Sequence, residues 1–386
     1  MEPSPAFRGG QQSADLALAN FDVTGYAKDR NEVWPAQRRG ASRLSPYIRH
    51  GLLNLQRVWS HVAGGPAADV TRFRDELLWQ EYARHLYARV GEQTRRSLRY
   101  SVREQDAQPA DPAVVWGGDG ALCLEQSWTE LRDQGWLPNQ SRMWLASHWS
   151  VRQDAGWRDG EDIFFRHLLD GSRAANRLGW QWTTGALTGK AYGFSQWQVH
   201  KRAPGLCSRC PLQSCCPIGH WPDTQEREAR VGVDPALRRD EDLSATAGPG
   251  TPQLQGEPDA VWMTAESLGD DDPALAAHPE LPIVFVFDVP LLARLRLAGT
   301  RLVFLTETLA DLATRRQVHL AVGSVEAALA GLQLAATFTP VPGWRRRVAH
   351  LRVVATYPWP WLRPPKAGPV TSFTAWSRAG GTRSRS

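Results

Sequence analysis

The sequence predicts two domains of different class, an all-helical domain followed by a Rossmann-like parallel α/β domain. From Val23 to about Val199 apolar residues recur at three- and four-residue spacing, as in Phe73 and Leu77, which is the period of an amphipathic helix. Beyond residue 257 short apolar runs alternate with helical segments, a pattern typical of a parallel sheet with crossover helices. The 386 residues leave room for two domains of roughly 150 residues each.

Composition and pattern divide the chain into five segments. They are a Gly/Ser/Gln-rich disordered start at 1–22, the helical domain at 23–222, a charged and Gly/Pro-rich linker at 223–257, the α/β domain at 258–378 and a disordered tail at 379–386. The expected strands are Val261–Thr264, Ile283–Asp288, Val318–Val322, Leu334–Thr339 and Leu351–Thr356, with helices at Glu307–Arg316 and Ser324–Leu332.

The overall composition is that of an ordinary globular protein, with 42% hydrophobic and 22% charged residues. No apolar run reaches the roughly 18 residues of a membrane span, and the N-terminus has no signal-peptide pattern. Five cysteines are too few for a disulfide scaffold, so we expect a cytoplasmic protein. We also expect a monomer. A net charge of +5 permits a polyanionic partner. The 18 tryptophans pack cores for the most part, but they also indicate an aromatic ligand.

Several short constellations combine small, polar and charged residues at helical spacing. The segment 40–45 (GASRLS) precedes a helical pattern and suits either a bound phosphate or an ordinary helix cap. Glu76, Trp79 and Gln80 share one helix face, and Asn139, Arg142 and Met143 repeat that spacing. The segment 170–182 (DGSRAANRLGWQW) joins an acid, an amide and small residues. Each of these alone is equally typical of a satisfied helix end.

Together and in this order, the constellations resemble the flavin-binding domain of the DNA photolyase/cryptochrome family. The matching stretches are SRLSPYIRHGLLN, DELLWQEYARHL, GWLPNQSRMWLASHW, WRDGEDIFFRHLLDGSRAANRLGWQW and TGKAYGF, over about residues 26 to 194. The resemblance implies a helical domain that holds a U-shaped FAD. It also implies light-driven repair of cyclobutane pyrimidine dimers in UV-damaged DNA, by electron transfer from reduced FAD to a flipped-out lesion.

The resemblance assigns roles to residues of the flavin site. The cofactor-binding residues that it implies are Tyr26, Ser42, Arg43, Leu44, Ser45, Gln80, Asn139, Arg142, Asp170, Ser172 and Asn176. Arg142 would pair with Asp170 beside the flavin ring, and Asn176 would face flavin N5, where an amide tolerates anionic reduced flavin better than a carboxylate. Gln80 and Ser172 depart from the family, which usually has Arg and commonly has Asp there.

The resemblance also assigns the residues that would meet the lesion. Substrate-binding residues would be Glu76, Trp79, Asn139, Met143 and Trp182, with Glu76 stabilising the dimer radical anion. Asn139 and Met143 match relatives that act on cyclobutane dimers, whereas relatives that act on (6-4) photoproducts have histidines. The alternative function is a cryptochrome-like blue-light sensor without repair activity.

Trp180 and Trp157 match the first two members of the family's electron-transfer chain, which photoreduces the flavin. The third, surface member is not placed by the sequence. Trp116 and Trp149 are guesses for that position.

Four of the five cysteines form a compact motif, Cys207-x2-Cys210-x5-Cys216-Pro, with Cys215 adjacent. Zinc, free thiols and an iron–sulfur cluster are all compatible with such spacing. One subgroup of the family carries a [4Fe–4S] cluster with a further cysteine ahead of the substrate helix, and Cys123 suits that place. The expected metal ligands are therefore Cys123, Cys207, Cys210 and Cys216.

The order of the two domains is inverted relative to the family, whose α/β domain normally precedes the helical one. The stretch Val261–Leu268 looks like the opening of that α/β domain, so the chain looks circularly permuted. The usual Arg-Asp-Leu-Arg is replaced by residues 265–268 (AESL). An antenna chromophore, folate or deazaflavin, is therefore unsupported, and a fold-supporting role for this domain is the alternative.

Overall fold

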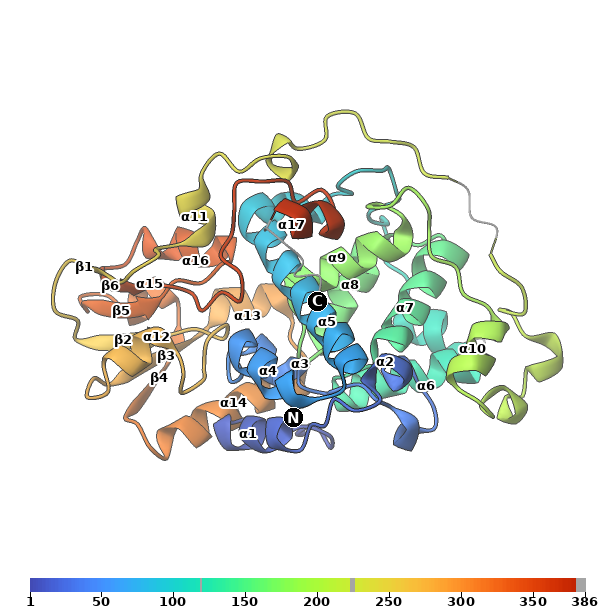
Figure 1. Cartoon of the computed structure of the whole chain (residues 1–386), viewed down its shortest axis with the longest axis horizontal. Coiled ribbons are helices and arrows are strands. Elements are labelled where there is room, and N and C mark those ends of the chain that lie inside the picture. Colours follow the sequence, from blue (N-terminus) through green and yellow to red (C-terminus); the bar gives the residue numbers. More distant parts are fainter. Residues whose placement is uncertain (119, 223–225, 380–386) are drawn as a thin grey trace.

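The structure, a computed structural model, describes residues 1–118, 120–222 and 226–379. A helical half and an α/β half lie side by side, and the long helix α5 (Ala67–Val90) runs between them (Figure 1). This arrangement confirms the predicted combination of a helical and an α/β fold. Among the described residues, α5 and every other helix are too short or too polar to span a bilayer.

Nine helices of the described residues build the helical half around α5. They are α2 (Tyr26–Asp29), α3 (Ser45–Arg49), α4 (Leu55–His61), α5, α6 (Leu122–Gln134), α7 (Asn139–Ser147), α8 (Trp157–His167), α9 (Arg173–Thr184) and α10 (Gln196–Arg202). Local chemistry fixes the ends of α9, because the Ser172 hydroxyl accepts a hydrogen bond from the Ala175 amide at 3.1 Å and Gly185 adopts a left-handed φ of 86°.

The α/β half contains a six-stranded sheet of order β1-β6-β5-β2-β3-β4. The strands are β1 (Gln253–Leu254), β2 (Ala260–Met263), β3 (Ile283–Asp288), β4 (Val318–Gly323), β5 (Leu334–Thr337) and β6 (Val353–Tyr357). All neighbours are parallel except β1, which is antiparallel to β6. The helices are α12 (Pro273–Ala277), α13 (Val289–Leu295), α14 (Gly299–Ala313), α15 (Val325–Ala328) and α16 (Pro342–Val348).

The strand order reverses at β2, which lies between β3 and β5. The chain proceeds from β2 to β3 and β4 on one side and then returns to β5 and β6 on the other. In such sheets a crevice opens beyond the carboxyl ends of the strands at the point of reversal. This crevice faces the helical half.

The two halves share one hydrophobic core. Tyr47 and Leu52 of the helical half are buried in the same cluster as Val261 and Phe304 of the α/β half. His50 bridges the halves through both ring nitrogens, which contact the carbonyl oxygens of Ala265 at 2.7 Å and Leu169 at 3.1 Å. Burial lowers the pKa of His50 to about 3, so the ring stays neutral and the junction does not titrate near neutral pH.

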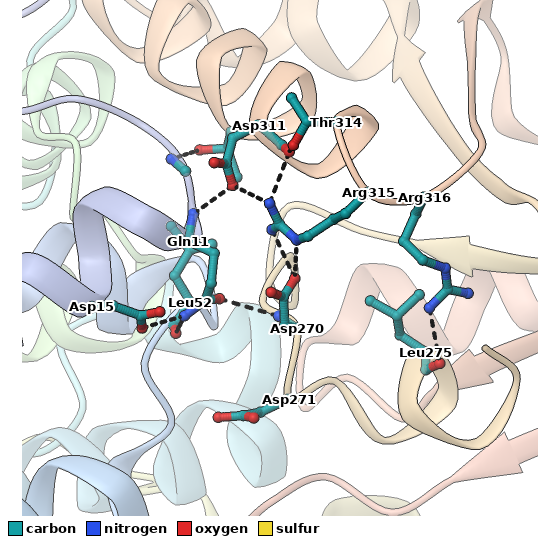
Figure 2. Close-up of polar contacts among 12 residues, drawn as sticks. Gln11, Asp15, Leu52, Asp270, Asp271, Leu275, Asp311, Thr314, Arg315 and Arg316 are labelled. Atoms are coloured by element: carbon teal, nitrogen blue, oxygen red, sulfur yellow. Dashed lines mark hydrogen bonds and ion pairs between the residues drawn. The ribbon is translucent and has the colours of Figure 1, made fainter.

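The N-terminal segment 1–22 is ordered, and the prediction of a disordered start is wrong. Helix α1 (Gln11–Ala19) packs on α14, and Figure 2 shows the polar contacts that dock it. The Gln11 amide nitrogen donates to Asp311 Oδ2 at 2.8 Å, and the Gln11 side chain accepts from the Asp270 amide at 3.1 Å. Arg315 contacts Asp270 and Asp311 at 2.8 and 2.9 Å and completes the junction.

The predicted linker at 223–257 is also partly structured. It contains the short helix α11 (Leu243–Ala247) and strand β1, which extends the sheet beyond the predicted boundary at residue 258. Residues 223–225 of this linker lie outside the described residues.

The end of the predicted α/β domain returns to the helical half. Helix α17 (Phe373–Ala379) packs on α5. The rest of the predicted disordered tail, 380–386, lies outside the described residues.

Candidate functional site

A cleft of about 670 Å³ lies between the helical half and the carboxyl ends of the sheet strands. Its walls come from α5, α8 and the start of α9 on one side and from β2, α13 and α16 on the other. Eleven arginines and only four carboxylates line it among the described residues. A volume of this size is typical of small-molecule sites, and the excess of positive charge favours an anion.

Gln80 and Ser172 line this cleft, as do Ala174 and Ala175 at the start of α9. Gln80 supplies no charge where the family usually has a cation. Arg84, one turn further along α5, lines the same wall, makes no ion pair with a described residue and lies over the Trp359 ring at 5.0 Å. Burial lowers the pKa of Arg84. Arg84 therefore supplies a positive charge close to Gln80, which has none.

Arg142 and Asp170 form a two-pronged ion pair, as the resemblance implies. The guanidinium nitrogens of Arg142 donate to the two carboxylate oxygens of Asp170 at 3.1 and 2.7 Å. Arg142 Nε also donates to the Leu137 carbonyl at 2.9 Å. The Asp170 side chain is only 6% exposed, so this pair joins the start of α7 to the loop between α8 and α9.

Asn176 is held by Glu161 on the neighbouring helix α8. Its side-chain nitrogen donates to Glu161 Oε1 at 2.8 Å and to the Glu161 carbonyl at 2.9 Å. Both partners are acceptors, so the Asn176 oxygen points away from Glu161. Burial raises the pKa of Glu161, and Arg173 and Arg177 oppose that shift. Glu161 thus orients the Asn176 side chain. No local sequence pattern predicts this role of Glu161.

The residues expected around the flavin phosphates do not line the cleft. The Ser45 hydroxyl accepts a hydrogen bond from Trp136 Nε1 at 3.1 Å, and the Arg43 guanidinium lies over the rings of Phe7 and Trp136 at 4.8 and 5.4 Å. The N-terminal segment that contains Phe7 therefore covers this region.

Other members of the same predicted set are also engaged locally. Tyr26 packs edge-on against Phe73 at 4.9 Å. Ser42 accepts from the Leu44 amide at 3.4 Å, and Leu44 is fully buried. Of the predicted cofactor residues, only Gln80 and Ser172 line the cleft. The structure therefore does not bring the predicted set together around this cleft.

The predicted lesion-binding residues are partly accessible. Trp79 is 39% and Trp182 38% exposed, and Glu76 lies 3.5 Å from Arg30. Desolvation raises the pKa of Glu76 against the opposing effect of Arg30. Phe373 of α17 stacks on Trp79 with ring centres 4.1 Å apart and an interplanar angle of 10°.

Asn139 and Met143 also contact one another. The Asn139 side-chain nitrogen lies 3.5 Å from the Met143 sulfur. The two residues that the sequence predicts to define lesion type are therefore neighbours on one face of α7.

Trp180 belongs to a continuous aromatic cluster, and Trp157 is buried in the same hydrophobic core. Trp180 meets Phe164 at 5.0 Å, and Phe164 meets Trp116 at 5.8 Å. Trp116 in turn contacts Trp149 at 5.0 Å. Within the described part of the chain no ring contact is recorded for Trp157, which is fully buried. The two guesses for the third position thus lie together, Trp116 two ring contacts from Trp180 and Trp149 three.

The four predicted metal ligands surround one small cavity. Cys123, Cys207, Cys210 and Cys216 all line a space of about 10 Å³. Burial, followed by the neighbouring cysteines, raises the pKa of Cys123 to about 12 and that of Cys207 to about 11. Among the described residues, however, no three metal-ligating side chains are close enough to hold a single ion as they stand. The predicted metal centre is therefore not shown, although its ligands converge.

Comparison with known proteins adds to this geometry. Residues 73–202 match the family model described as the FAD binding domain of DNA photolyase. The deoxyribodipyrimidine photo-lyase of Synechococcus sp. is 28% identical over 184 residues, which are 45% of this chain and 36% of that protein. The protein of the same name from Thermus thermophilus is 32% identical over 184 residues, 46% of this chain and 43% of its own.

A crystal structure of a bacterial class III photolyase from Agrobacterium tumefaciens aligns with a TM-score of 0.40 and 26% identity, over 46% of this chain and 38% of that one. The chain thus spans less than half the length of the curated relatives that it matches. The match to an FAD-binding domain includes α5 to α10, the helices that contain Gln80, Arg142, Asp170 and Asn176.

Proposed function

We propose that this chain is a flavoprotein that uses light to split cyclobutane pyrimidine dimers in DNA. The observation that carries the proposal is the match of residues 73–202 to the FAD binding domain of DNA photolyase. The relatives named deoxyribodipyrimidine photo-lyase support it. The cationic cleft beside Gln80 and Ser172 would suit the diphosphate of FAD, although the other predicted cofactor residues do not line it. Reduced FAD, when bound, would supply an electron to the lesion on absorbing light.

The remaining steps belong to residues of this chain. Arg142 and Asp170 would fix the loop beside the flavin ring through their two-pronged pair. Asn176, oriented by Glu161, would present its oxygen. Glu76, 3.5 Å from Arg30, would contact the lesion through its carboxyl group and stabilise the dimer radical anion.

We also propose a circularly permuted relation to the family. What supports it is that a parallel sheet follows the flavin-domain match, which ends at residue 202.

A second candidate function is a cryptochrome-like blue-light sensor that binds FAD without repairing DNA. The stacking of Phe373 on Trp79 favours it, because a ring of the chain itself occupies one face of the tryptophan that would meet the lesion. A single experiment distinguishes the two functions. Purified protein is illuminated with an oligonucleotide that contains one thymine dimer, and restored thymines are counted against a dark control. Flavin absorption near 450 nm without any repair would support the sensor.

Glu76→Ala should lower the repair yield about 10- to 150-fold, because a hydrogen bond to a charged group contributes about 1.5–3 kcal/mol. FAD content and affinity for dimer-containing DNA should change little. Asp75→Ala, which removes the neighbouring carboxylate on α5, is the matched control and should repair like the wild type. Equal repair by Glu76→Ala would remove Glu76 from the lesion pocket.

We further propose that Cys123, Cys207, Cys210 and Cys216 hold a metal centre, with a [4Fe–4S] cluster preferred to zinc. A cluster binds each thiolate through a different iron, so its ligands stand farther apart than those of one ion. Burial raises the pKa values of Cys123, Cys207 and Cys216. These thiols would release protons on binding a metal, which couples metal affinity to pH and to folding.

Protein purified without oxygen should contain iron, and Cys123→Ser should lose it together with stability against urea. Cys215 is exposed and does not line the cavity, so Cys215→Ser should keep full metal content. Zinc in place of iron would change the assignment of the metal, and full iron in Cys123→Ser would exclude Cys123 as a ligand. Metal analysis reads this result directly, without any assay of activity.

A further inference from the structure

Two tryptophans outside the predicted lesion pocket are unusually exposed. Trp197 on α10 is 60% exposed, and Trp221 is 54% exposed. Large aromatic side chains at such exposure forgo the burial that normally stabilises them. Neither residue has a role in the function proposed above.

Tyr192 contacts Trp182 and also α10, the helix that contains Trp197. The rings of Trp182 and Tyr192 are 5.6 Å apart, and the Tyr192 hydroxyl accepts a hydrogen bond from Gln198, the neighbour of Trp197 on α10, at 3.0 Å. Trp221 packs against the same segment, since a Cβ on Gly193 would lie 3.2 Å from its ring. We call Trp182, Tyr192, Trp197 and Trp221 the tryptophan surface.

The segment that contains these rings is rich in cations. Residues 171–222 contain six lysines and arginines and no aspartate or glutamate, and three of the six, Arg173, Arg177 and Arg202, pair with carboxylates of other segments. Lys201 lies over the Trp197 ring at 5.0 Å, and Arg209 lies over Trp34 at 5.4 Å. Neither cation forms an ion pair with a described residue. An anionic partner would therefore meet cations that no carboxylate of this chain already neutralises.

We propose that the tryptophan surface binds single-stranded DNA, with bases stacked on Trp197 and Trp221 and phosphates near Lys201 and Arg209. Exposed aromatic rings interleaved with cations are the means by which proteins hold single strands without regard to sequence. A duplex keeps its base faces stacked on one another and cannot offer them to these rings. This proposal rests on the proposed function. The ligand would be the DNA strand that continues beyond the flipped lesion.

The test is fluorescence anisotropy of a labelled, undamaged 16-nucleotide oligo(dT) with the full chain in the dark. A duplex of the same length serves for comparison. We expect the single strand to bind more tightly than the duplex. Trp197→Ala and Trp221→Ala should each weaken its binding about fivefold to a hundredfold. Trp197→Phe and Trp221→Phe keep a ring and are the matched controls, with nearly wild-type affinity. Lys201→Ala should reduce the salt dependence of log Kd by about 0.7.

Equal affinity of the alanine variants and the wild type would overturn the proposal, as would tighter binding of the duplex than of the single strand. In either case a protein partner becomes the better occupant of these rings. Both tryptophans are more than half exposed, so urea midpoints should remain at the wild-type value and exclude misfolding as the cause. The wild type could bind oligo(dT) and yet show no preference for dimer-containing over undamaged strands. That result would contradict the repair function but would still support single-strand binding by the tryptophan surface.

Discussion

Arg142→Ala should lower the free energy of unfolding by about 3 kcal/mol and release bound FAD. Asp170 is nearly buried and accepts hydrogen bonds from both guanidinium nitrogens. Removal of the guanidinium leaves a carboxylate away from water with no counter-charge, and breaking one partner of such a pair typically costs a few kcal/mol. The loop between α8 and α9, which leads into the helix that contains Asn176, should then loosen. Urea unfolding and the ratio of flavin to protein absorbance are the two measurements.

Two further variants separate charge from geometry. Arg142→Lys keeps the charge but cannot make the two-pronged contact, so it should lose about half as much stability as Arg142→Ala. The double variant Arg142→Ala/Asp170→Ala removes both charges and should be more stable than Arg142→Ala alone. An Arg142→Ala protein with an unchanged urea midpoint and full flavin content would show that the pair stabilises neither the fold nor the cofactor site.

Local sequence signals were sufficient where neighbouring residues decide the structure. The run Ile283–Asp288 is β3 with the same bounds as predicted, because an apolar run rich in β-branched and aromatic residues suits a strand buried on both faces. The pairing of Arg142 with Asp170, 28 residues apart, was implied by the resemblance alone. No local sequence pattern connects a residue of α7 to the loop between α8 and α9.

Long-range docking explains most of what the sequence did not predict. The first residues are polar and small, a composition that predicts disorder. In the structure they are ordered by docking, in which Asp311, 300 residues later, accepts a hydrogen bond from the Gln11 amide. Helix α17 is equally remote from its partner, and the Trp376 indole donates to His85 across 291 residues at 2.9 Å. The cationic cleft has the same origin, because its arginines come from both halves of the chain. Periodicity within a window cannot detect contacts of this kind.

The pH dependence of stability should show the effect of one buried carboxyl group on α5. Glu81 is fully buried, and one of its oxygens accepts the Arg363 amide at 3.0 Å while the other has no hydrogen-bond partner. Burial raises the pKa of Glu81 from 4.5 to about 7, against the effects of Arg84 and Arg363. His85 beside it remains neutral, because burial lowers its pKa to about 3.

The sign of the effect follows from which state binds the proton more tightly. Between pH 4.5 and 7 the folded chain keeps the Glu81 proton and the unfolded chain loses it, so the free energy of unfolding falls as pH rises and then levels off. A shift of this size corresponds to about 3 kcal/mol. Glu81→Gln still accepts the Arg363 amide but does not titrate. The stability of the wild type relative to Glu81→Gln should therefore decrease by that amount from pH 4.5 to 7.5, as measured by urea unfolding at four pH values. Glu125→Gln, an exposed exchange on α6, should follow the wild-type curve, and parallel curves for wild type and Glu81→Gln would mean that Glu81 is ionised in the folded protein.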